Sequence, residues 1–427
     1  MPDSPRKKPN YAGRNLVVCC DGTNNQFGKE STNVIRLVQI LDRDHAKQRL
    51  YYQPGIGTFP EPDALTKWWT EFYDVLGLAF GLGVIRNIQD AYRFLMEMWE
   101  QGDRIFLFGF SRGAYTVRVL AGMLHAVGLL GHGSDEMIPY AMRLYKQLDE
   151  RSGNESKIGG WTKLCGDFRW TFARPMFDGD SDRHCRVHFI GVWDTVSSVG
   201  WFTNPAKFPF TATNPSVDVI RHAVSIDERR SFFRQNLFHR ASPEQDLKEI
   251  WFPGSHCDVG GGYPSVFSSS PEVKSELWRL SFNWIVDEAQ QEGLLIDPDR
   301  RHTVVKTESP PRNIWADPIH ESLTGMWWPL AEYWPKKTWN SQTKTYEYKA
   351  GDSTPRSVPE GALIDQSALE RIRDNSLNYA PPNLSEAFRT NVVSLQDVPR
   401  DVPYASGVAP PASTSANVVS TAVGKSP

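Results

Sequence analysis

The most informative stretch of this chain is Arg104-Ile105-Phe106-Leu107-Phe108-Gly109-Phe110-Ser111-Arg112-Gly113. A strand is expected over 104–110, apolar from Ile105 onward, and leads directly into Ser111; a helix rich in Ala, Val and Leu is expected over about 113–126. A continuous apolar run bounded by turn residues is typical of a strand buried on both faces. The pattern G-x-S-x-G would arise by chance roughly 0.2 times in a chain with this glycine content. The strand before it and the helix after it make the pattern specific, and they predict a nucleophile elbow at Ser111.

An elbow needs these residue types for physical reasons. The serine takes a strained backbone conformation at the end of a parallel strand, and the flanking Gly109 and Gly113 let strand and helix approach without Cβ clashes. The free N–H groups at the start of the helix can then stabilise an oxyanion. The alternative interpretation is that Ser111 only caps the helix and that both glycines serve packing.

Outward from this unit, strands and helices alternate. Apolar runs predict the other strands at Asn15–Cys20, Leu50–Gln53, His184–Trp193 and Leu247–Phe252. Helical apolar spacing predicts helices at Thr32–Leu41, Val84–Trp99 and Glu276–Gln290. Such alternation is typical of βαβ units. We therefore expect an α/β-hydrolase fold, with a mostly parallel central sheet, helices on both faces and a helical insertion or cap.

The chain divides by composition into an ordered core and its extensions. A disordered leader is expected at 1–13, the α/β-hydrolase domain at 14–300 and a helical insertion within it at about 131–182. A C-terminal cap or extension is expected at 301–400. The Pro-, Ala-, Ser-, Thr- and Val-rich end at 401–427 lacks aromatic and charged clusters, so we expect a disordered tail.

Composition excludes several classes of protein. The formal net charge of -3 argues against nucleic-acid binding, because such proteins usually carry a basic surface. The five cysteines show no CxxC pair, which argues against a disulfide framework or a zinc ribbon. No apolar stretch is long enough for a transmembrane segment, and the N-terminus shows no secretory signal. We expect a soluble cytoplasmic protein that needs no cofactor.

A serine nucleophile needs a histidine to remove its proton and a carboxylate to hold that histidine. In this fold the chain order is Ser, then acid, then His. Asp194 follows one predicted strand and His256 follows the next, so both lie at the strand ends where an open α/β sheet binds ligands. These residues complete the predicted triad. Asp258 and Asp227 are the alternative acids.

Other histidines compete with His256 for the role of base. His222 has a helical context, in which a structural role is favoured over a catalytic one. His125 lies within the helix after Ser111 and is expected to point away from the site. His256 instead lies in a Gly-rich loop, where backbone freedom lets its side chain reach inward.

The oxyanion hole is expected to use the N–H of Arg112 and a second N–H from Gly22 or Thr23, because the fold uses an early strand–helix loop for this purpose. The alternative at that loop is an Asx-type turn in which Asp21 caps its own backbone. Asp21 and Asp258 are candidates for contacting the substrate or supporting the catalytic side chains. The Arg112 side chain could bind an anionic group such as phosphate, but pairing with Asp21 is favoured.

Four separated motifs, in order, carry a resemblance to a known family. They are Asn15–Asn25 (NLVVCCDGTNN), Gly109–Leu120 (GFSRGAYTVRVL), Phe189–Val196 (FIGVWDTV) and Pro253–Tyr263 (PGSHCDVGGGY). Over roughly residues 14 to 300 the chain resembles the DUF2235 family of α/β-hydrolases, which is related to the type VI secretion phospholipase effectors of the Tle1 class. The resemblance implies an α/β-hydrolase fold and phospholipase A activity. Carried over by motif, it implies Ser111, Asp194 and His256 as the triad.

The leading hypothesis is a serine hydrolase that cleaves carboxyl esters, including lipid esters, through an acyl-enzyme. Its partners would be a small-molecule or lipid ester, with peripheral membrane contact left open. Residues 75–88 and the insertion after Gly131 are candidates for a lid. A second hypothesis is a metal-dependent hydrolase, with ligands from Asp21, Asp194, His256 and Asp258. A third is a catalytically silent hydrolase fold that serves as a binding scaffold.

Overall fold

The computed structural model describes most of the core of the chain. The described residues are 12–22, 31–55, 68–148, 155–196, 200–201, 204–205, 208–263, 274–305, 313–323, 336–340, 345–349, 353–384 and 392–393. The predicted tail at 401–427 lies outside them, as does the predicted leader except for residues 12 and 13.

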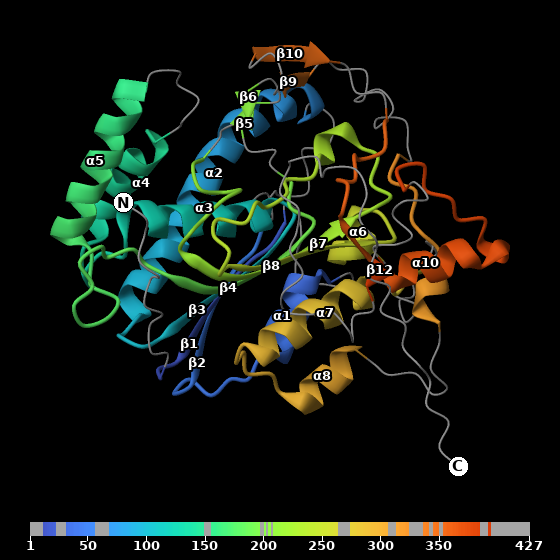
Figure 1. Cartoon of the computed structure of the whole chain (residues 1–427), viewed down its shortest axis with the longest axis horizontal. Coiled ribbons are helices and arrows are strands. Elements are labelled where there is room, and N and C mark those ends of the chain that lie inside the picture. Colours follow the sequence, from blue (N-terminus) through green and yellow to red (C-terminus); the bar gives the residue numbers. More distant parts are fainter. Residues whose placement is uncertain are drawn as a thin grey trace.

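An 8-stranded sheet forms the centre of the molecule (Figure 1). Each pair of neighbouring strands is parallel. In sheet order the strands are β12 (Val392–Val393), β11 (Leu363–Asp365), β8 (Asp246–Phe252), β7 (Val217–Ser225), β4 (Val187–Trp193), β3 (Arg104–Phe110), β1 (Asn15–Cys20) and β2 (Gln48–Gln53). Two small antiparallel pairs lie outside this sheet, β5 (Gly200–Trp201) with β6 (Asn204–Pro205) and β9 (Lys336–Asn340) with β10 (Thr345–Lys349).

Helices cover both faces of the sheet (Figure 1). One face carries α2 (Trp68–Met98), α3 (Arg112–Val127), α4 (Ile138–Lys146) and α5 (Glu155–Phe172). The other carries α1 (Asn33–Ile40), α7 (Trp278–Gln291) and α8 (Pro298–Val305). The short α6 (His256–Gly260) follows β8, and α10 (Gln366–Arg373) follows β11. The α/β fold expected from the sequence, with a parallel sheet between two helical layers, is confirmed.

The core lies on the two faces of the central strands. Because successive side chains of a strand point to opposite faces, β1 and β3 contribute to two separate apolar clusters. Leu16 and Leu107 pack in the cluster that contains the buried faces of α2 and α3. Val17 and Phe108 pack in the cluster that contains α1 and α7. The unbroken apolar runs in the sequence reflect this burial on both sides.

Strand β7 corrects the interpretation of His222 as a helical residue. His222 lies in the middle of Val217–Ser225, and every residue of this strand is buried. The sequence pattern was misleading because charged residues interrupt the apolar run. Those charges are paired inside the protein: Arg221 contacts Glu288 at 2.5 Å and Asp246 at 2.6 Å. Tertiary partners therefore permit a buried strand that local composition does not suggest.

The sheet also extends beyond the predicted end of the α/β domain near residue 300. β11 pairs with β8, with Leu363 opposite Ile250, and β12 continues the sheet beside β11. Part of the segment expected to be a separate cap therefore belongs to the central sheet. These strands are too short, at 3 and 2 residues, to leave a readable pattern in the sequence.

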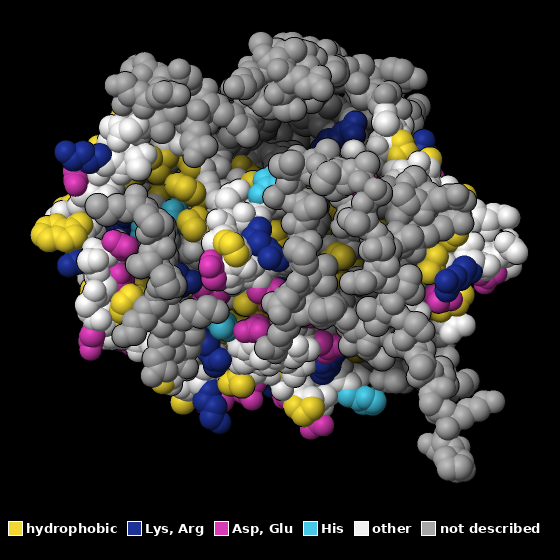
Figure 2. Space-filling model, viewed as in Figure 1, with side chains coloured by type: hydrophobic (Ala, Val, Ile, Leu, Met, Phe, Trp, Pro, Cys, Tyr) yellow, Lys and Arg dark blue, Asp and Glu magenta, His cyan; other side chains and the backbone are white. Residues whose placement is uncertain are grey.

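The segment expected as a helical insertion contains α4 and α5, and both helices pack against α3. Apolar side chains reach the surface over these two helices, at the left of Figure 2. The exposed large apolar residues are Tyr140, Leu164, Trp170 and Phe172. Residues 75–88, proposed as a lid, lie within α2. None of the helices in the described part of the chain is long and apolar enough to cross a membrane.

Candidate active site

The predicted catalytic residues follow neighbouring strands at one edge of the sheet. Ser111 directly follows β3 and Asp194 directly follows β4, and the last residues of these strands, Phe110 and Trp193, are paired. The Ser111 N–H donates to the Trp193 carbonyl at 3.1 Å, which joins the two strand ends. His256 begins α6, shortly after the end of β8. The parallel arrangement brings these three residues to the same edge.

Ser111 has a backbone conformation that non-glycine residues rarely adopt, with φ 57° and ψ -121°. Its side chain makes no capping hydrogen bond to α3, so the alternative interpretation of Ser111 as a helix cap lacks the bond that defines a cap. Close packing explains the glycine that follows. A Cβ on Gly113 would lie 2.1 Å from the carbonyl oxygen of Cys20, so α3 can begin against the end of β1 only with glycine there.

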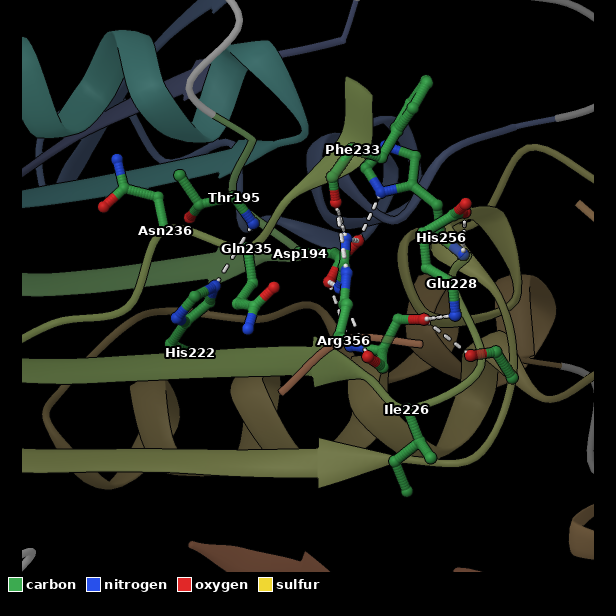
Figure 3. A network of polar contacts seen from close by, with 12 residues as sticks. Asp194, Thr195, His222, Ile226, Glu228, Phe233, Gln235, Asn236, His256 and Arg356 are labelled. Carbon is green, nitrogen blue, oxygen red and sulfur yellow. Dashed lines mark hydrogen bonds and ion pairs between the residues drawn. The ribbon is translucent and has the colours of Figure 1, made fainter. Parts of the chain in front are cut away.

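Asp194 and His256 form a buried pair (Figure 3). The His256 Nδ1 lies 2.5 Å from Asp194 Oδ2, and the two side chains are 3% and 0% exposed. Aromatic rings hold the imidazole on two sides, since its centroid lies 4.6 Å from that of Phe110 and 4.8 Å from that of Phe233. Because the carboxylate accepts from Nδ1–H, the Nε2 of His256 is left as the basic nitrogen.

A residue from the C-terminal segment, Arg356, contacts the carboxylate of this pair. Arg356 makes a two-pronged contact with Asp194, with Nη1 2.5 Å from Oδ1 and Nη2 2.9 Å from Oδ2. The Ser225 N–H adds a bond of 2.9 Å to Oδ1. Figure 3 shows Arg356 and His256 on two sides of the same carboxylate. Sequence reasoning missed Arg356, because it lies in a loop without periodicity and far from the other motifs.

These contacts decide the charges of the pair. Burial alone would raise the pKa of Asp194, but the positive charge of Arg356 and the hydrogen bond from His256 hold it well below its ordinary value. Burial lowers the pKa of His256, and the interaction with Asp194 offsets this only in part. Both shifts favour an ionised carboxylate beside a neutral imidazole.

Glu228 supports the His256 backbone and was also missed. Its Oε2 accepts from the His256 N–H at 3.2 Å, and the carboxylate is fully buried. Arg230 neutralises it with contacts of 2.9 and 2.8 Å to the two carboxylate oxygens. Although burial would raise the pKa of Glu228, this ion pair lowers it. The only signal in the sequence was a cluster of charged residues over 227–230, which is indistinguishable from a solvated turn.

The two alternative acids contact other partners. Asp258 closes a capping box with Ser255 and lies 2.6 Å from His320 Nδ1. Asp227 accepts from the Gly254 N–H at 2.7 Å and from the Tyr379 hydroxyl at 2.9 Å. Burial raises the pKa of Asp227 to about 6. Of the three candidate acids, Asp194 is the one hydrogen-bonded to the His256 ring.

The competing histidines have partners of their own. His222 Nδ1 lies 2.7 Å from Glu249 Oε2, with both side chains fully buried, and its Nε2 accepts from the Thr195 N–H at 3.2 Å. The His222–Glu249 pair therefore fixes the backbone at Thr195, the residue that follows Asp194. His125 lies in the last turn of α3, at the end of the helix far from Ser111. Its Nδ1 lies 2.8 Å from the Ser216 hydroxyl.

In the early loop after β1, the Asp21 side chain bonds the next backbone N–H and a hydroxyl further along the chain; the i to i+2 bond that defines an Asx-type turn would involve Thr23. Asp21 Oδ1 accepts from the Gly22 N–H at 2.7 Å, and its Oδ2 accepts from the Thr32 hydroxyl at 2.7 Å. Thr23 lies outside the described residues. The Arg112 N–H is at the start of α3, directly after Ser111, and burial lowers the pKa of the Arg112 guanidinium to about 10.

Of the four residues named for a metal site, Asp194 and His256 contact each other, whereas Asp21 contacts its own loop and Asp258 contacts Ser255 and His320. Within the described ranges, no group of three or more His, Cys, Asp or Glu side chains is arranged to hold a metal ion.

Comparison with known families and curated proteins gives two matches at the level of sequence. Residues 14–288 match the family described as "T6SS, Phospholipase effector Tle1-like, catalytic domain". An uncharacterised protein of Saccharomyces cerevisiae, YEL023C, is 38% identical over 233 residues, which is 53% of this chain and 33% of the yeast protein. The chain thus matches about a third of the length of that relative.

Two solved structures are similar at low sequence identity. An uncharacterised protein from Pseudomonas aeruginosa is 17% identical, with a TM-score of 0.39, over 89% of this chain and 61% of that one. A Tle1 effector bound to the VgrG spike of the type 6 secretion system is also 17% identical, with a TM-score of 0.37, over 70% of this chain and 77% of that one.

Proposed function

Because this chain belongs to the family of Tle1-like phospholipase effector catalytic domains, we propose that it is a serine hydrolase that cleaves carboxyl esters of lipids. The observation that carries the proposal is the buried Asp194–His256 pair at the same sheet edge as Ser111. A carboxylate that fixes Nδ1–H and leaves Nε2 basic is what activation of a serine hydroxyl requires.

In the proposed reaction, Ser111 Oγ attacks the ester carbonyl while His256 Nε2 takes the hydroxyl proton. The resulting oxyanion is stabilised by the Arg112 N–H at the start of α3 and by a second N–H from Gly22 or Thr23; use of Gly22 would require its N–H to leave Asp21 Oδ1. His256 then gives its proton to the leaving alcohol, and an acyl-serine remains. Water, deprotonated by His256, attacks the acyl carbonyl, and the bond to Ser111 Oγ breaks as His256 returns the proton to that oxygen, which releases the acid and restores Ser111.

The backbone at Ser111 supports this role. Its left-handed φ of 57° costs free energy, of order 1–3 kcal/mol for a strained residue. No capping hydrogen bond offsets this strain. The conformation is best explained by presentation of the hydroxyl beyond the end of β3.

The preference for lipid esters rests on the description of the family, since the same triad would cleave any ester that the pocket admits. Asp21 and Asp258 are proposed as supports of the site, because both fix loops that adjoin the catalytic residues. Peripheral contact with a membrane and a cytoplasmic location are compatible with this chemistry.

Labelling with a fluorophosphonate probe tests the proposal. The wild-type protein is expected to react covalently, and Ser111→Ala and His256→Ala are expected to lose both labelling and hydrolysis of a panel of phospholipids and short acyl esters. Ser134→Ala is the matched control, because Ser134 lies before the 3-10 helix at Asp135–Met137 and outside the proposed site.

The outcome also separates the other two hypotheses. Hydrolysis that EDTA abolishes and that resists the fluorophosphonate would indicate a metal-dependent hydrolase instead. A folded wild-type protein that neither reacts with the probe nor hydrolyses any ester would favour the binding scaffold and refute the proposed function.

A further inference from the structure

Arg356 reaches the catalytic acid from outside the region that matches the family. The family match ends at residue 288, and Arg356 lies in the loop before β11. Its guanidinium is only 1% exposed, although arginine is rarely buried unless it is paired. The ion pair with Asp194 offsets the free energy that is lost when the Arg356 charge is removed from water.

Every N–H of the guanidinium has an acceptor. Nη1 donates to Asp194 Oδ1 at 2.5 Å and to the Ser225 carbonyl at 3.2 Å. Nη2 donates to Asp194 Oδ2 at 2.9 Å and to the Phe233 carbonyl. Nε donates to the same Phe233 carbonyl at 3.1 Å. An arginine has five such donors in a fixed plane, so its orientation is fully determined.

The carboxylate of Asp194 is equally occupied. Oδ1 accepts from Arg356 and from the Ser225 N–H, and Oδ2 accepts from Arg356 and from His256 Nδ1. A carboxylate has about four acceptor positions, so little rotational freedom is left. The plane of the carboxylate, and with it the direction in which the imidazole is held, is set by the guanidinium.

The Arg356 loop is itself anchored to the core. The Asn383 side-chain amide donates to the Arg356 carbonyl at 3.1 Å and to the Ile226 carbonyl at 3.0 Å. The Gln235 amide donates to the Ser357 carbonyl at 2.9 Å. The guanidinium is therefore presented to Asp194 from a fixed backbone.

We propose that Arg356 is a positioning residue that orients Asp194 and keeps His256 a neutral base. This inference rests on the proposed function of the site and adds the C-terminal segment to its catalytic apparatus. The physical reason is charge. Without Arg356, the negative charge of the buried Asp194 would not be neutralised. It would then stabilise the imidazolium form of His256 and raise the pKa of His256.

Two other charged groups near His256 act on its pKa in opposite directions. They are Glu228, which raises the pKa of His256, and Arg230, which lowers it. These two form a buried ion pair, with 2.8 Å between Arg230 Nη2 and Glu228 Oε2, so their effects largely oppose each other. Arg356 is the cation in direct contact with the Asp194 carboxylate, and its positive charge lowers the pKa of Asp194.

The pH dependence of kcat/KM on a short acyl ester tests the proposal. Neutral His256 is the active form, so activity falls as the pH drops through its pKa, and a higher pKa moves this loss to higher pH. Arg356→Gln is expected to move the acid limb upward by about one pH unit or more, the size of shift that a close opposite charge produces. Arg356→Lys retains the charge, so its acid limb should stay near that of the wild type.

The lysine variant separates orientation from charge. Lys cannot donate in two parallel directions, so kcat is expected to fall by roughly ten- to a hundredfold through misorientation of the pair. A wild-type kcat in folded Arg356→Lys would overturn the positioning role. This variant also decides the question if Arg356→Gln fails to fold.

Arg371→Gln is the matched control, because Arg371 is a buried arginine of the same C-terminal segment that donates to the carbonyls of Trp315 and Asp317. It should leave the acid limb unchanged. An equal shift in Arg371→Gln would assign the effect to packing of the segment and refute the proposal.

An NMR titration of His256 makes the test independent of catalysis. The imidazole signal, assigned by its loss in His256→Gln, is expected to titrate at higher pH in Arg356→Gln than in the wild type. Equal midpoints in two folded proteins would refute the role of Arg356. Failure of the proposed function would instead appear as an unlabelled, inactive wild type, whatever the titration shows.

Discussion

Ser111 and Arg356 are two residues whose roles depend on very different ranges of the chain. Ser111 is shaped by its immediate neighbours, since β3 ends before it and α3 begins after it. Arg356 acts on Asp194 from 162 positions away. The first could be predicted from local pattern, and the second could not, because no local signal indicates where a loop arginine will be buried.

The strain at Ser111 gives a prediction about stability. Glycine adopts positive φ without a Cβ clash, so Ser111→Gly should unfold with a free energy about 1 kcal/mol higher than that of Ser111→Ala. Denaturation with urea measures the difference, and neither variant needs to be active.

Ser134 supplies the control for this comparison, because its φ of -92° is ordinary for any residue. There the glycine variant should be less stable than the alanine variant by about 0.4–1 kcal/mol, through the entropy of the unfolded chain. The same ranking at both serines would show that the backbone at Ser111 is not strained.

At the scale of elements, β7 is the long strand of the sheet that sequence patterns misjudged. Arg221 is 1% exposed and contacts both Glu288 and Asp246, while His222 pairs with Glu249. The strands predicted from unbroken apolar runs were found, because hydrophobic burial on two faces leaves a direct trace in composition. A strand that buries charges has no such trace, since its partners come from β8 and α7.

Removal of one partner from this cluster should be costly. Arg221→Met would remove the cation 2.6 Å from Asp246 and leave Glu288 with Lys248, 3.1 Å away, so we expect a loss of about 3 kcal/mol in unfolding free energy, at the low end for a broken buried pair. Thermal and urea denaturation measure it. Arg86→Met is the control: the Arg86 side chain is 84% exposed, so a change within about 0.5 kcal/mol is expected. Similar losses at both sites would contradict a buried ionic cluster in β7.

For the whole molecule, the C-terminal segment closes the fold as well as the site. Val224, Ile226 and Trp251 of the core pack against Val358, Ala362, Ile364 and Ala368. β11 covers the edge of β8, which would otherwise present unpaired backbone groups. The division at residue 300 that composition suggested therefore separates parts of one sheet.

A truncated chain that ends at residue 352 tests whether the C-terminal segment is needed for the core to fold. It would lose β11, α10 and the cover of Trp251, and each fully buried apolar side chain contributes about 1.5–3 kcal/mol. We expect binding of a hydrophobic dye, aggregation and loss of a single cooperative unfolding transition. Arg356→Gln in the full-length chain is the comparison, because it removes the ion pair with Asp194 and keeps the strands. A truncated chain that unfolds cooperatively and stays monomeric would show that the segment is dispensable for folding.

The strand–serine–helix unit, the parallel α/β sheet and the positions of Asp194 and His256 at strand ends could all be inferred from the chain alone. They depend on hydrophobic periodicity and on the order of residues, which are local properties. The partners of the proposed catalytic acid, Asp194, could not. Asp194 meets His256 across 62 positions and Arg356 across 162, and Asp258 and Asp227 are drawn to other donors. Such choices follow from which buried charges can satisfy one another once the sheet is assembled, and that balance exists only in three dimensions.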